Sequence, residues 1–199
     1  TTPQQAWVYW NTLQHQRTAG EVFEIAMEHA RRAVERAKAR TGQDIDVISF
    51  AELKSKLAYS LPKQDASLNF PEQSRLATRA LIESLGITRP TVVMGFGSIP
   101  YSAVSLRDES LRATISEAVQ PFGLGSVNYF AGISDMSFFG ESSGDLSVAA
   151  ENTPVWGTSF TMTESAGFPC INVGPWGRDY HHWLERLHDR AAPIAIDLE

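Results

Sequence analysis

Apolar residues recur at the spacing of an amphipathic helix in the first half of the chain. Residues 21–40 place valine, isoleucine and alanine on one face and arginine and glutamate on the other, which predicts a helix. Thr18 fits the N-cap of this helix and Gly42 fits its end. A second helix is predicted over residues 72–86, and helical structure is expected over the whole of residues 1–40.

Two shorter segments have the length and pattern of strands. Residues 44–50 alternate between polar and apolar side chains, and residues 91–96 form a continuous apolar run, which is typical of a buried parallel strand. Further helices are predicted over residues 108–123 and, near the end of the chain, over residues 180–192. Strands that alternate with helices indicate an α/β fold.

The pattern changes near residues 88–90, which divides the chain into two predicted parts. Residues 1–88 are predicted to be mostly helical, whereas residues 89–199 are predicted to form the strands and helices of an α/β sheet domain. The chain has 199 residues, of which 43% are hydrophobic. It can therefore bury a substantial core in one large domain or two small ones.

Charge and composition exclude several classes of function. The formal net charge is −6, whereas a nucleic-acid-binding protein needs a basic face, so no nucleic-acid partner is expected. No apolar run approaches the roughly 18 residues of a membrane span, so no membrane partner is expected either. The single cysteine, Cys170, cannot form an internal disulfide. It fits a reducing cytoplasm, which is the compartment we expect.

The segment GESSG, residues 140–144, matches the Gly-x-Ser-x-Gly pattern of a serine-hydrolase nucleophile elbow. Ser142 would be the nucleophile, and Asp179 and then His181 or His182 follow in the order of such a hydrolase. The elbow needs a strand before the serine and a helix after it, and the flanking sequence is poor in both. The alternative is a flexible surface loop rich in glycine and serine.

Two adjacent histidines, His181 and His182, lie between a Gly/Pro-rich turn and the predicted last helix. Neutral imidazole is the commonest metal ligand in proteins. In a helix that begins near His181, Glu185 would share its face and could orient the imidazole, and His188 would lie one turn further along. The alternative is that both histidines are polar residues at a helix start, one solvated and one half-buried.

The stretch FPCINVGPWGRDYHHWLER resembles the C-terminal signature of the dizinc exopeptidase and deacylase family. That family includes aminoacylase, carboxypeptidase G and succinyl-diaminopimelate desuccinylase. Its signature has a strand, then Gly-Pro, a zinc-binding histidine a few residues later, and a glutamate four positions after the histidine. Gly174, Pro175, His181 and Glu185 match it in order and spacing.

Upstream, the stretch YFAGISDMSFF resembles the family's Gly-Gly-Thr-Ser-Asp loop, which lines the substrate pocket. Gly132, Ser134 and Asp135 match that loop, whereas Ala131 and Ile133 depart from it. Within the family, the likeness is strongest to the arginine-utilisation protein group. The N-terminal stretch AWVYWNTLQHQRTAGEVFEIA resembles a segment of that group's inserted lid domain, so the first predicted part would be helical lid.

The resemblance implies a metal-dependent hydrolase that cleaves an amide bond in a small peptide or an N-acyl amino acid. Two zinc ions are implied in the complete enzyme, where the metal polarises the carbonyl and acidifies a bound water while a glutamate takes the proton. His181 would be a zinc ligand and Glu185 its support. Arg178 would bind a substrate carboxylate, with a solvated turn charge as the alternative. A link to arginine or amino-acid breakdown is a further hypothesis.

The sequence lacks other parts of the family's zinc site. The family uses an earlier His-x-Asp pair, a bridging aspartate and a Glu-Glu pair whose first member is the general base, and neither pair occurs here. A catalytic zinc takes about three protein ligands and a water. The chain, which begins at Thr1 rather than Met, is therefore expected to be the C-terminal part of a longer enzyme or a degenerate relative. A non-catalytic module that dimerises through its helices stays open, so a homodimer is a candidate assembly.

Overall fold

A computed structural model gives the fold of the chain, which mixes helices with a small parallel sheet and a small antiparallel hairpin. The expected α/β character is confirmed at this level. Among the residues that the structure describes, no helix is both long and apolar enough to cross a membrane. The described residues are 4–13, 17–57, 65–101, 106–126, 146–161, 167–171, 177–179 and 182–187.

The long helix α1 (Ala19–Thr41) forms where the apolar periodicity predicts it. A capping box closes its first turn. The Thr18 hydroxyl accepts from the Glu21 backbone N–H at 3.2 Å, and the Glu21 carboxylate accepts from the Thr18 N–H at 2.7 Å. Gly42 ends the helix with a φ of 71°, a left-handed conformation that glycine adopts without strain. Both predicted ends of this helix are confirmed.

A β–α–α–β unit follows α1 along the chain. Strand β1 (Asp46–Ser49) leads into α2 (Phe50–Ser55), then α3 (Phe70–Ser84) and strand β2 (Thr91–Met94). The two strands pair in parallel along their whole length. The two predicted strands and the predicted second helix are therefore confirmed, with small shifts at their ends.

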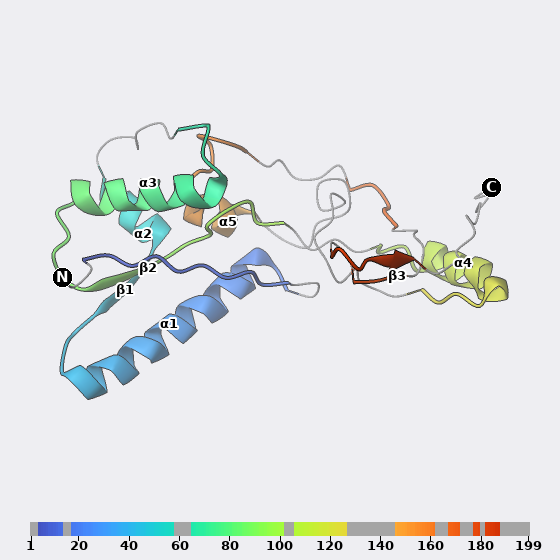
Figure 1. Cartoon of the computed structure of the whole chain (residues 1–199), viewed down its shortest axis with the longest axis horizontal. Coiled ribbons are helices and arrows are strands. Elements are labelled where there is room, and N and C mark those ends of the chain that lie inside the picture. The colour runs from blue at the N-terminus through green and yellow to red at the C-terminus, as the bar shows by residue number, and fades with distance from the viewer. Residues whose placement is uncertain are drawn as a thin grey trace.

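These elements stack in three layers around the sheet (Figure 1). Helix α1 packs against one face of the two strands, and α2 and α3 cover the other face. The core on the second side consists of Phe50, Leu53 and Leu81, each at most 1% exposed, with Ile48 and Val93 of the strands packed against them. Burying a side chain of this size stabilises the fold by about 1.5–3 kcal/mol, so this core holds the layers together.

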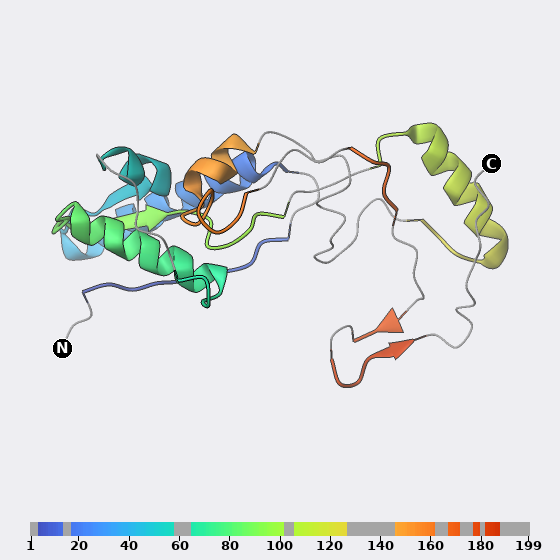
Figure 2. The same ribbon diagram turned by 90° about the horizontal axis from the view of Figure 1, so that it is seen from above.

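Helix α5 (Ser147–Asn152) closes the carboxyl end of the sheet and lies beside the start of α1 (Figure 2). The side chain of Asn152 accepts a hydrogen bond from the Ala51 N–H at 3.1 Å and donates one to the Val148 carbonyl at 3.0 Å. Its backbone carbonyl accepts from the Phe96 N–H at 2.8 Å. Asn152 thus joins α5 to the ends of both strands. We call α1, β1, α2, α3, β2 and α5 the layered body.

Helix α4 (Glu109–Val119) continues into the short 3-10 helix η1 (Gln120–Phe122). Asp108 caps its first turn, as expected for an aspartate at this position. The predicted helix over residues 108–123 is confirmed. None of the residues of α4 is buried by the described part of the chain.

The expectation of helix over the whole of residues 1–40 is wrong for residues 4–13. These residues have no helix and no strand pairing, and in the view of Figure 1 they cross the molecule between α3 and α1. The reason is local, because the run Trp7–Trp10 consists of aromatic and β-branched side chains. Such side chains favour extended backbone over helix.

Strand β1 belongs to the first predicted part of the chain and β2 to the second. Their pairing carries one sheet across the predicted boundary near residues 88–90. Close to that boundary, the Asp46 N–H donates to the Pro90 carbonyl at 2.9 Å. The division into two domains stays a prediction.

Candidate functional site

The segment with the adjacent histidines forms a small hairpin in its described residues. Strand β3 (Gly177–Arg178) pairs antiparallel with β4 (Arg186–Leu187), and we call residues 177–179 and 182–187 the hairpin. The predicted helix over residues 180–192 is wrong for the second of these ranges, which forms a turn and a strand instead.

Asp179 explains why the chain turns here rather than starting a helix. Its φ is 59°, whereas a helix N-cap has extended backbone. Its carboxylate pairs with the Arg186 guanidinium at 2.9 Å instead of capping backbone N–H groups. The His182 N–H donates to the Asp179 carbonyl at 3.0 Å, and the Glu185 N–H donates to the His182 carbonyl at 2.8 Å. These bonds close two successive turns.

Glu185 lies at the end of the second turn, directly before β4, and its side chain is exposed. The helix on whose face His181 and Glu185 are predicted to lie together is therefore absent from residues 182–187. A role for Glu185 in supporting the imidazole stays a prediction, and it would have to act across a turn. The neighbouring Trp183 is 85% exposed, so the tip of the hairpin presents an aromatic ring to solvent.

Arg178 is exposed and lies opposite Arg186 in the antiparallel ladder. Two guanidinium groups in this position repel each other, and the ion pair between Arg186 and Asp179 offsets that repulsion. Among the described residues no carboxylate pairs with Arg178. Its predicted role, bidentate binding of a substrate carboxylate, stays a prediction.

The remaining predicted site residues lie outside the residues that the structure describes. This set comprises His181, Gly132, Ser134, Asp135 and Ser142. After the elbow pattern, the nearest described helix is α5, which is preceded by Leu146 without a side-chain cap. The serine-hydrolase alternative therefore also stays a prediction.

A metal site requires several ligand side chains in one place. Within the described residues, no three histidine, cysteine, aspartate or glutamate side chains form a group that could hold a metal ion. A catalytic zinc takes about three protein ligands, so the described residues do not fit a complete zinc site and no reaction step can be derived through one. The predicted metal site depends on His181 and on further ligands.

The carboxyl end of the parallel sheet is the usual place for a ligand in an α/β fold. Here it is closed by packing, because a Cβ on Gly95 would lie only 2.8 Å from the Asn152 carbonyl oxygen. Ser49 at the end of β1 caps α2 and exchanges hydrogen bonds with Glu52. No local sequence pattern indicates the importance of Asn152, which is 4% exposed. The described polar residues at this edge therefore stabilise the fold.

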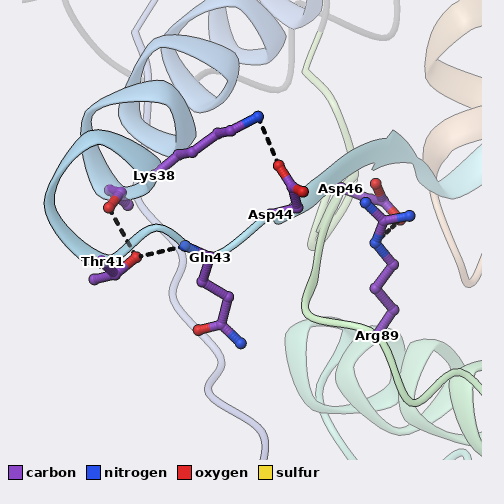
Figure 3. Close-up of polar contacts among 7 residues, drawn as sticks. Lys38, Thr41, Gln43, Asp44, Asp46 and Arg89 are labelled. Carbon is purple, nitrogen blue, oxygen red and sulfur yellow. Dashed lines mark hydrogen bonds and ion pairs between the residues drawn. The ribbon is translucent and has the colours of Figure 1, made fainter.

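A charged cluster lies where α1 leads into β1 (Figure 3). Lys38 pairs with Asp44 at 2.6 Å, and Arg89 pairs with Asp46 at 3.3 Å. The hydrogen bond to Lys38 lowers the pKa of Asp44 below its ordinary value, and the same bond raises the pKa of Lys38. All four side chains are substantially exposed, so the first pair contributes modestly to the connection between α1 and β1, and the second to the connection between the starts of β1 and β2.

Comparisons with known proteins give one distant similarity. The chain is 24% identical to the "Uncharacterized protein YqjN" of Bacillus subtilis (strain 168) in an alignment of 226 residues. That alignment covers 94% of this chain and 41% of the relative. The chain thus spans about two fifths of the length of the curated relative that it matches. No family model matches the chain, and no solved structure matches it significantly.

Proposed function

We propose that the chain is part of a zinc-dependent hydrolase that cleaves an amide bond in a small peptide or an N-acyl amino acid. The observation that carries the proposal is the match of Gly174, Pro175, His181 and Glu185 to the family's C-terminal signature in order and spacing. The loop resemblance at Gly132 adds a second, independent stretch. On this proposal the protein works in the cytoplasm, in arginine or amino-acid breakdown.

The greater length of the matched relative supports the idea that the further zinc ligands belong to a longer protein. The relative extends well beyond the matched region, because the alignment covers 41% of it. A full zinc site, with the two ions that the resemblance implies, would then draw on polypeptide that this sequence does not include.

The chain's own contribution would be to bind and orient. His181 would be a metal ligand, and the loop containing Ser134 and Asp135 would line the substrate pocket. Arg178 would bind the carboxylate of the amino-acid part of the substrate. This role is supported by its exposed side chain, which no carboxylate of the described hairpin pairs with.

The test compares two adjacent histidines in the natural polypeptide that contains this sequence. His181→Ala should lower the zinc content measured by mass spectrometry and abolish hydrolysis of a panel of N-acetyl amino acids. His182→Ala is the matched control, because it removes the neighbouring imidazole, and it should retain both properties. Arg178→Gln should raise KM more than it lowers kcat, because it weakens substrate binding.

Two results would overturn the proposal. One is full zinc content and activity in the His181→Ala variant. The other is a protein that holds no zinc and hydrolyses the panel through a residue labelled by a phosphonate, with loss of activity in Ser142→Ala. That second result would establish the serine-hydrolase alternative.

A further inference from the structure

We draw no further inference here: the strongest candidate, the exposed surface patch that Trp7, Val8, Tyr9 and Trp10 form on the segment ahead of α1, carries nothing because no contact in the described part of the structure shows what covers it.

Discussion

The layered body and the hairpin are stabilised in different ways. The body has a core of Phe50, Leu53 and Leu81 that is almost inaccessible to solvent. The described turn of the hairpin has only exposed side chains, and it is closed by backbone hydrogen bonds and the ion pair between Asp179 and Arg186. The body therefore depends on burial, whereas the segment with the candidate chemistry depends on local polar contacts.

The largest difference between the regions should appear when leucines are truncated. Leu81→Ala removes a fully buried side chain and should lower the free energy of unfolding by about 2–5 kcal/mol, because it also leaves a cavity. Leu184→Ala truncates a half-exposed leucine of the hairpin and should change it by less than about 0.5 kcal/mol. Urea unfolding measures both values. Equal losses would show that the hairpin shares the cooperative core of the body.

A smaller effect is expected at the polar link within the body. Asn152→Ala removes the acceptor of the part-buried Ala51 N–H, and leaving a donor without a partner away from water costs about 1–3 kcal/mol. Gln43→Ala, at an exposed position, is the control and should unfold like the wild type. The same urea titration applies. An Asn152→Ala variant as stable as the control would contradict the role of Asn152 in joining α5 to the strands.

The capping box of α2 should make part of the body's stability depend on pH. The Ser49 backbone N–H, and then the Ser49 hydroxyl, hold the pKa of Glu52 below its ordinary value of 4.5. A carboxylate with a lowered pKa stabilises the folded state above that value and loses this contribution as the pH falls through the folded pKa. As the pH is lowered past about 4.5, the free energy of unfolding should therefore decrease. Glu52→Gln should make this decrease with pH less steep.

Urea titrations at a series of pH values provide this measurement. Glu24→Gln, on an exposed position of α1, is the matched control and should keep the slope of the wild type. An unchanged slope in Glu52→Gln would show that the capping box adds nothing to the acid sensitivity of the body.

The smallest effect is expected in the hairpin itself. Asp179→Asn weakens an exposed ion pair with Arg186, which contributes at most about 1 kcal/mol and only to local stability. Hydrogen exchange followed by NMR should become faster at the His182 and Glu185 amides, while the unfolding of the body stays unchanged. High salt should likewise speed exchange at these amides in the wild type and change it little in the variant. If neither the substitution nor salt changes the exchange rates, the backbone hydrogen bonds of the turns alone hold the hairpin.

Helices and strands of the body are predictable because their signals are local. The apolar period predicts α1, and Thr18 and Gly42 fix its ends through contacts within a few residues. The apolar pattern likewise predicts β1 and β2. The prediction of helix over residues 4–13 is wrong because it extends the strong period of the neighbouring α1, whereas the side chains of residues 7–10 favour extended backbone.

The hairpin and the link at Asn152 depend on contacts that no local pattern contains. Asp179 turns the chain with the help of Arg186, which lies seven positions further on, and Asn152 bonds to Ala51 across 101 positions. For the candidate site, the spacing of His181 and Glu185 predicts one helix face, whereas residues 182–187 form a turn and a strand. The motif match to the hydrolase family does not depend on the helix and stays a prediction.

The parallel pairing of β1 with β2 has a practical consequence for dissecting the molecule. A cut in the exposed connection at Gly86 would leave each fragment with one strand of the same sheet. Neither fragment could complete the sheet by itself, but the two could recombine. This connection is therefore a suitable point for a split-protein reporter, in which recovered signal measures reassembly of the two pieces.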